Sequence, residues 1–129
     1  MMYSAITHSI QIIVEPFYDV KNSSPIQERY IFTYHITIKN NGNVPIKLLK
    51  RKWQIYDVGF GVREVSGDGV IGMMPEIYPG EEFNYFSNVS LRAGVGAMQG
   101  NYLLMNLDTK DTFEVEIPKF SLITEVVYN

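Results

Sequence analysis

Strict alternation of apolar and polar residues over positions 30–39 is the feature of this sequence that most constrains its fold. Tyr30, Phe32, Tyr34, Ile36 and Ile38 alternate there with Ile31, Thr33, His35, Thr37 and Lys39. Because successive side chains of a β-strand point to opposite faces, the pattern predicts an antiparallel strand with one buried face and one solvated face. The residues at 40–43, Asn-Asn-Gly-Asn, accept the positive φ angles of tight turns and end the strand. We therefore expect a hairpin to a long strand over residues 44–58.

The same alternation recurs along the chain. Further strands are expected at residues 10–14, 61–65, 83–91, 102–104 and 113–117, with Pro16 and Pro118 ending the first and the last of them. No stretch combines helical length with a helical period and a cap, so very little helix is expected. About seven or more short strands separated by turn residues predict an all-β antiparallel sandwich of the immunoglobulin or fibronectin III-like kind.

Length and composition bound the remaining choices. The 129 residues fit one domain, 1–129, with a core at about 10–125, and the 46% apolar content can fill that core. The absence of cysteine excludes disulfides and thiolate metal sites. A net charge of −3 gives no electrostatic reason to expect a nucleic-acid partner. The first residues lack a basic cluster and a long apolar run, so we expect no membrane insertion and a cytoplasmic location.

One position conflicts with the alternation in the strand over residues 44–58. Arg51 shares its parity with the apolar residues Leu49, Trp53 and Ile55. Either a β-bulge shifts the register, or the Arg51 stem packs inward beside Trp53 and its head reaches an acid or the rim of the sandwich. We expect a structural role for Arg51 and a core position for Trp53.

A glycine-rich bend is the first candidate for a binding site. Gly67, Gly69 and Gly72 match the pattern G-x-G-x-x-G, but Pro75 leaves no room for the helix that a dinucleotide-binding motif requires. Successive backbone N–H groups can hold an anion without a helix. Residues Gly67, Asp68, Gly69 and Gly72 are therefore candidate ligand-binding residues, and the alternative is that the glycines only form a sharp bend at the sandwich edge.

Apolar residues beside this bend are candidates for a partner contact. Phe60, Met73, Met74 and Ile77 flank the glycines, and flexible methionines suit adaptable contact surfaces. The alternative is that they close one end of the core. Neither histidine has an acid or a second histidine at ligand spacing, so no metal site and no cofactor are expected. No nucleophile, base and orienting group can be placed together, which argues against an enzyme.

Motifs in a fixed order carry a resemblance to a known family. They are Arg51-x-Trp53-x-Ile55-x-Asp57, Glu64-Val65-x-Gly67-x-Gly69-Val70-Ile71-Gly72, Pro79-Gly80-Glu81-x-Phe83-x-Tyr85-x-Ser87, Gly96-x-Met98-x-Gly100-x-Tyr102 and Phe113-x-Val115-x-Ile117-Pro118-x-Phe120-x-Leu122. From about residue 10 to its end, the chain resembles the ApaG family. It departs from the family at Met73-Met74, where polar residues are usual, and at residues 92–95, which replace a usual Thr-Pro entry.

The resemblance implies a fibronectin type III-like or immunoglobulin-like sandwich. Members of the family occur as small bacterial proteins and as a domain of F-box and polymerase-interacting proteins, where the domain is expected to bind proteins. The bacterial members are linked to cobalt and magnesium resistance. The glycine motif of the family, here Gly67, Gly69 and Gly72, is proposed to contact a nucleotide or pyrophosphate.

Two functions from different classes follow. The first is a non-catalytic binding or adaptor module whose partner is a protein or a phosphorylated small ligand. The alternative is a nucleotide- or pyrophosphate-binding protein that uses the glycine loop, with weak or no pyrophosphate hydrolysis. A second copy of the chain, paired along an exposed sheet edge, is a further candidate partner.

Overall fold

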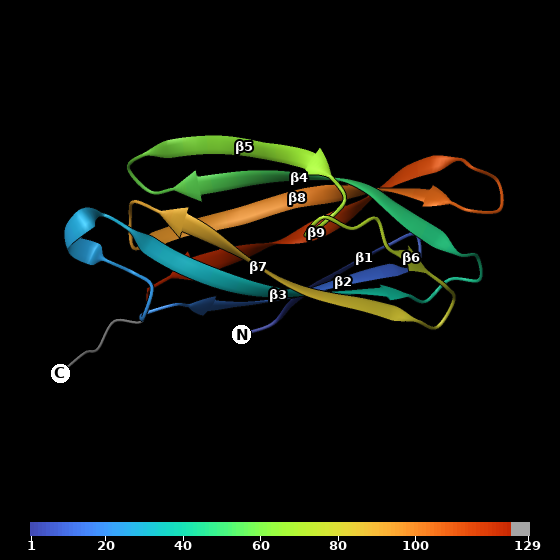
Figure 1. Ribbon diagram of the computed structural model, residues 1–129, viewed down its shortest axis with the longest axis horizontal. Helices are drawn as coiled ribbons and strands as arrows, with labels where there is room; N and C mark the ends of the chain where they lie inside the picture. Colours follow the sequence, from blue (N-terminus) through green and yellow to red (C-terminus); the bar gives the residue numbers. More distant parts are fainter. Residues whose placement is uncertain (125–129) are drawn as a thin grey trace.

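Two antiparallel β-sheets pack face to face in the computed structural model, which describes residues 1–124 (Figure 1). The first sheet has the order β1(Tyr3–Thr7), β2(Ile10–Tyr18), β3(Tyr30–Asn40), β7(Glu82–Leu91). The second has the order β5(Gly61–Asp68), β4(Ile46–Asp57), β8(Val95–Asn106), β9(Thr112–Ile123), and β6(Glu76–Ile77) also pairs with β4. In residues 1–124 the only helical element is the short 3-10 turn η1(Pro25–Gln27). The predicted class, an all-β antiparallel sandwich with very little helix, is confirmed.

The core lies between the inward faces of the two sheets. Strand β3 buries Phe32, Tyr34, Ile36 and Ile38, as its alternation predicts. From the opposite sheet, Trp53 is 3% exposed, which confirms its predicted core position. Burying a large apolar side chain contributes roughly 1.5–3 kcal/mol, so this alternation drives the packing of the two sheets. The predicted core boundary at residue 125 lies just outside the described residues.

The expected hairpin after β3 is wrong, because β3 and β4 lie in different sheets. Residues 41–45 carry the chain from one sheet to the other. The buried Asn40 side chain holds this crossing: its Nδ2 donates to the carbonyls of Val44 and Ile77, and its Oδ1 accepts the N–H of Gly42. Asn and Gly therefore form a turn here as predicted, but the turn joins two layers rather than two neighbours in one sheet.

Two prolines that were expected to end strands lie inside them. Strand β2 continues through Pro16 to Tyr18. Its neighbour β1 pairs only as far as Val14, so one edge of β2 is free at Pro16. Strand β9 continues through Pro118 to Ile123; it is the last strand of its sheet, and its register with β8 shifts beside this proline. A residue without an N–H group is tolerated at such free edges and bulges.

The two long edges of the sandwich differ. Along one edge β1 is tied to β9, because the Ser121 and Glu116 N–H groups donate to the Tyr3 and Thr7 hydroxyls. Along the other edge the end strands are β5 and β7. Figure 1 shows β5 at the margin of its sheet, outside β4, and every β5 residue except Gly67 is exposed. This open edge carries the candidate site.

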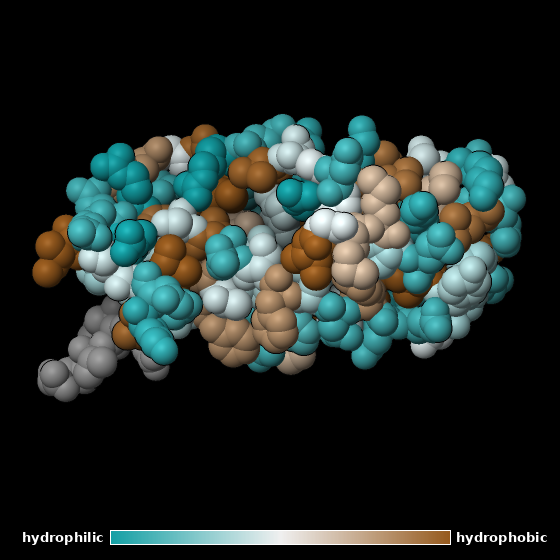
Figure 2. All heavy atoms as spheres, viewed as in Figure 1, coloured by the Kyte–Doolittle hydropathy of each residue, from teal (hydrophilic) through white to brown (hydrophobic). Residues whose placement is uncertain are grey.

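No helix among residues 1–124 has the length and apolarity needed to span a membrane. On the face shown in Figure 2, apolar side chains form separate groups among polar ones rather than one continuous patch. Large continuous apolar patches mark extensive protein contacts. The apolar groups on this face do not form a surface of that kind.

Candidate functional site

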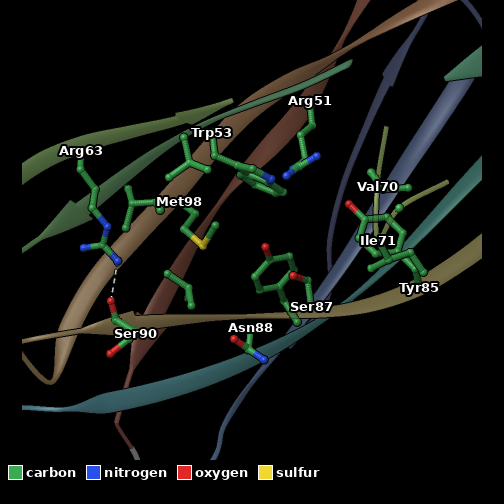
Figure 3. Close-up of a pocket in the computed structure, with 15 residues that line it drawn as sticks. Arg51, Trp53, Arg63, Val70, Ile71, Tyr85, Ser87, Asn88, Ser90 and Met98 are labelled. Carbon is green, nitrogen blue, oxygen red and sulfur yellow. Dashed lines mark hydrogen bonds between the residues drawn. The ribbon is translucent and has the colours of Figure 1, made fainter. Parts of the chain in front are cut away.

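A cleft with a volume of about 420 Å³ opens between the two sheets at the β5–β7 edge (Figure 3). Strands β4, β5 and β8 form one wall, β3 and β7 form the other, and residues 70–72 close one end. Sites for small organic ligands usually measure about 300–1,000 Å³ and combine apolar walls with a few polar groups. The lining combines apolar side chains with many polar ones, namely two arginines, two tyrosines, two serines and one asparagine.

A β-bulge aims Arg51 into this cleft. The register of β4 against β8 shifts between Leu48 and Lys50, so Leu48 is fully buried, Leu49 is half-buried and Arg51 turns inward beside Trp53. Both explanations offered by the sequence therefore hold together. The Arg51 head reaches backbone rather than an acid, because Nη1 donates to the carbonyls of Asp68 at 3.0 Å and Gly69 at 2.9 Å.

Three of the five Arg51 N–H donors, on Nε and Nη2, have no hydrogen-bond partner among residues 1–124. In the same range no buried side-chain nitrogen or oxygen lacks a partner, so these donors are accessible to solvent. None of the ion pairs formed within residues 1–124 includes Arg51. In Figure 3 the Arg51 side chain projects into the space between the sheets, beside Trp53. The cleft thus contains a positively charged fork whose charge no carboxylate neutralises.

The second arginine of the cleft, Arg63, is engaged by the protein. It extends from β5 across the mouth of the cleft, and its Nη2 donates to the backbone carbonyl of Ser90 on β7 (Figure 3). Its Nη1 lies 3.8 Å from the buried Asp57 carboxylate. That carboxylate also accepts the N–H groups of Arg92 at 2.8 Å and Ala93 at 2.9 Å, which fixes the crossing from β7 to β8. Arg63 therefore holds the two edge strands together and has a counter-charge.

Tyrosine hydroxyls lie at the floor of the cleft. The hydroxyls of Tyr85 and Tyr102 form a hydrogen bond. Burial raises the pKa of Tyr34 and that of Tyr85, and it raises the pKa of Tyr102 well above its ordinary value. The nearby Arg51 charge lowers each of these pKa values, but by less than burial raises them. All three side chains therefore stay neutral at neutral pH. Tyr34 and Tyr85, which line the cleft, present hydroxyls rather than phenolates to it.

Backbone geometry accounts for two glycines of the G-x-G-x-x-G run, and at the third the Arg51 guanidinium leaves little room for a side chain. Val70 and Met73 exchange both backbone hydrogen bonds, and the two residues between them, Ile71 and Gly72, have φ angles of 43° and 75°. Positive φ at both central residues is the mark of a type I′ hairpin turn. Gly69 has φ of 60°, and a Cβ there would lie 2.0 Å from the Met73 carbonyl oxygen. At Gly67 a Cβ would lie 2.9 Å from Arg51 Nη2.

The candidate ligand-binding glycines do not share one concave surface. The N–H groups of Gly69, Val70 and Met73 bond to backbone carbonyls, so few donors of this bend remain for an anion. Gly72 lines the cleft, whereas Gly67 and Asp68 line a hollow on the outer side of the sheet. Ligand binding by Gly67, Asp68, Gly69 and Gly72 stays a prediction. The φ angles and the space taken by neighbouring atoms already account for the three glycines without a ligand.

The candidate partner-contact residues do not form one surface either. Phe60 lies in the β4–β5 turn with the Arg92 guanidinium 4.3 Å from its ring centre. Met73 and Met74, about half exposed, lie near the other end of the eight-residue β5, a span of roughly 26 Å. Ile77 is 2% exposed and pairs with Ile46 in the ladder. For Ile77 this burial agrees with the alternative that the side chain closes one end of the core. Partner contact through Phe60, Met73 and Met74 stays a prediction.

Other polar groups offer little reactive chemistry. In residues 1–124 no three side chains of His, Asp or Glu come together as metal ligands. His35 stacks on Phe86 on the outer face of its sheet, with ring centres 4.6 Å apart, and His8 packs edge-on against Phe113.

Sequence reasoning missed Arg63 and Tyr85 as cleft residues. The available signal was parity, because Arg63 has the inward parity of β5 and Tyr85 that of β7.

Comparisons with known proteins identify the family. The family model described as the ApaG domain matches residues 20–106. Protein ApaG of Allorhizobium ampelinum is 46% identical over 95% of this chain and 94% of its own length; Protein ApaG of Parvibaculum lavamentivorans is 46% identical over 94% and 92%. The crystal structure of the putative ApaA protein from Bordetella pertussis superimposes with a TM-score of 0.85 at 37% identity, covering 88% of this chain and 92% of that one. The chain belongs to the ApaG domain family, as its motifs predicted.

Proposed function

We propose that this chain is a non-catalytic binding module that takes its ligand into the cleft at the open edge of the sandwich. The observation that supports the proposal is the Arg51 fork, which no carboxylate neutralises, inside a cleft of about 420 Å³ with mixed apolar and polar walls. A fibronectin type III-like framework suits this role, because strands rather than long loops hold most of the cleft walls. Fold alone assigns no function, so the proposal rests on the cleft.

The groups that line the cleft favour binding over catalysis. General acid–base catalysis near neutral pH needs a group that gains or loses a proton there, usually an imidazole or a carboxylate. The described lining residues include neither. Its tyrosines have raised pKa values because they are buried, which makes them poor bases at neutral pH. We therefore propose that the cleft recognises a ligand and leaves it unchanged.

Fragment binding followed by NMR tests the proposal. A library of small anionic, neutral and cationic fragments is titrated into labelled protein, and the shifted amides are mapped. We expect shifts to cluster at the cleft amides and at the indole N–H of Trp53, the only tryptophan in the protein. Ser87→Leu adds bulk inside the cleft and should abolish these shifts. Ser66→Leu makes the same change on the exposed outer face of β5 and should leave them intact.

The proposed site would be refuted if the shifted amides lay outside the cleft. It would also be refuted if the fragments bound the Ser87→Leu variant with the same affinity as the unaltered protein. A protein partner, a second copy of the chain and a cytoplasmic location stay predictions. A role in cobalt or magnesium resistance also stays a prediction, and within residues 1–124 no cluster of metal ligands is available to carry it directly.

The second candidate function is binding of a nucleotide or pyrophosphate at the glycine loop. The N–H groups of Ile71 and Gly72 favour it, since neither makes a backbone hydrogen bond in the turn. Calorimetric titration with pyrophosphate and nucleotides, with and without magnesium, tests it. Heat of binding that survives Ser87→Leu would place the ligand at the loop, and the absence of heat in every titration would end this candidate.

A further inference from the structure

We propose that the cleft selects a small organic carboxylate with an apolar body, with the carboxylate on Arg51 and the body between Trp53, Met98 and Val89. This inference rests on the proposed function and names its ligand class. Three features of the cleft carry it: its charge, the free edge of one guanidinium, and the character of its walls.

The positive charge of the cleft favours a ligand with one negative charge. Two arginines and no acid line it. Arg63 lies 3.8 Å from the Asp57 carboxylate and donates to the Ser90 carbonyl, so the protein already supplies its counter-charge. Arg51 has no acidic partner within residues 1–124. A monoanion would neutralise the cleft, whereas a cation would be repelled and a dianion would bring a second charge onto a floor of neutral, buried phenols.

The hydrogen bonds that Arg51 already makes leave one recognition edge free. Nη1 is held by the Asp68 and Gly69 carbonyls. Nε and Nη2 lie on the opposite edge of the guanidinium and offer parallel N–H groups, the arrangement that pairs with both oxygens of a carboxylate. Because the two backbone carbonyls and the backbone at Gly67 confine the head, the fork is oriented before any ligand arrives. A preoriented donor loses little freedom on binding, so its hydrogen bonds contribute more fully.

Apolar side chains on both sides of the cleft can hold an apolar ligand body. Trp53, Ile55 and Met98 line one side, and Val89 lines the other. A methionine thioether adapts to different shapes and contacts aromatic rings favourably. The Ser87 and Tyr34 hydroxyls also line the cleft and can bond to a single polar substituent. An aromatic or branched aliphatic acid of modest size matches this combination of one charged end and an apolar body.

Fluorescence of Trp53, the sole tryptophan and part of the cleft wall, reports occupancy directly. The probes are hydrocinnamate, its neutral amide hydrocinnamide, and phenethyl phosphate, which share a phenyl group and differ in the head. We expect hydrocinnamate to bind at least roughly tenfold more tightly than the amide, since a charged hydrogen-bonded pair is lost. The phosphate should bind more weakly than the carboxylate. This comparison uses the unaltered protein, so it stays decisive even if a variant fails to fold.

Variants then locate the charge. Arg51→Gln should reduce hydrocinnamate affinity roughly tenfold and leave the amide nearly unaffected, and Arg51→Lys should recover part of the loss because it keeps the charge without the fork. Lys52→Gln is the matched control: it makes the same charge change one residue away, on the exposed outer face. Equal affinity for acid and amide, or equal losses in Arg51→Gln and Lys52→Gln, would overturn the inference. Tighter binding of the phosphate would overturn the choice of carboxylate.

The failure of this inference differs from that of the proposed function. If the amide binds as well as the acid and Ser87→Leu blocks both, the cleft is a binding site but charge does not select its ligand. If neither probe binds and no fragment shifts the cleft resonances, both the inference and the proposed function are refuted.

Discussion

Replacing Gly69 by alanine tests whether the glycine run exists for the backbone rather than for a ligand. Gly69 has φ of 60°, where a side chain costs about 1 kcal/mol. A Cβ would also lie 2.0 Å from the Met73 carbonyl oxygen, about 1 Å inside the shortest contacts that Cβ atoms make. The Met73 carbonyl must therefore move, which breaks its bond from Val70 and strains the return bond. Each bond contributes roughly 0.5–1.5 kcal/mol, so Gly69→Ala should lower the free energy of unfolding by roughly 2–4 kcal/mol.

Gly72→Ala is the matched control. Its φ of 75° is similarly unfavourable for alanine, but no atom lies within 4 Å of the added Cβ, so the loss should be about 1 kcal/mol. Urea unfolding followed by circular dichroism gives both values. Equal losses in the two variants would refute the steric argument at Gly69. An unchanged free energy of unfolding in Gly69→Ala would show that the turn adapts to the added side chain. Ligand contact would then again be a possible reason for the glycine.

Three further predictions concern the surroundings of the cleft. Asp57→Ala removes the acceptor of two backbone N–H groups at the β7–β8 crossing and should lower the free energy of unfolding by roughly 3 kcal/mol in urea, whereas a loss below about 1 kcal/mol would contradict this role. Tyr34, Tyr85 and Tyr102 have pKa values raised by burial, so the unfolded chain loses their protons first as the pH rises above about 10. The stabilisation from these tyrosines should be complete below that pH, and the free energy of unfolding should fall above it by up to roughly 1.4 kcal/mol per pH unit for each tyrosine. A free energy of unfolding that does not change with alkaline pH would refute this prediction. Arg51→Ala removes both hydrogen bonds to the glycine loop and should lower the melting temperature measured by calorimetry, and an unchanged melt would refute its structural role.

Local alternation predicted each strand whose inner face is continuously apolar. Strand β3 is the clearest case, because its parity alone places Phe32, Ile36 and Ile38 in the core. The pairing of strands was harder to predict, because the partner of a strand is chosen by contacts distant in sequence. The tight-turn residues after Asn40 are compatible with a hairpin and with a crossing between sheets, and only the buried Asn40 bonds favour the crossing.

The same reasoning applies to the candidate site. Arg51 was singled out because it violates the alternation, and this violation led to the cleft. Arg63 was not predicted, because a charged residue on an edge strand is compatible with the alternation of apolar and polar residues. Its role depends on β7 lying across the gap, 27 residues further along the chain, where the Ser90 carbonyl accepts its hydrogen bond. A site assembled from two sheet edges becomes visible only once the order of strands is known.

The exposure of β5 has a consequence for where the molecule opens first. This strand is held by its ladder to β4, and almost none of its side chains are buried. Segments with few buried contacts open at a lower free energy than the whole molecule unfolds, and their amide protons exchange with solvent sooner. Amides of β5 should therefore exchange well before those of β3, which lies between two neighbours. One wall of the cleft is thus a strand that should open early, and an occupant that contacts both walls would slow its exchange.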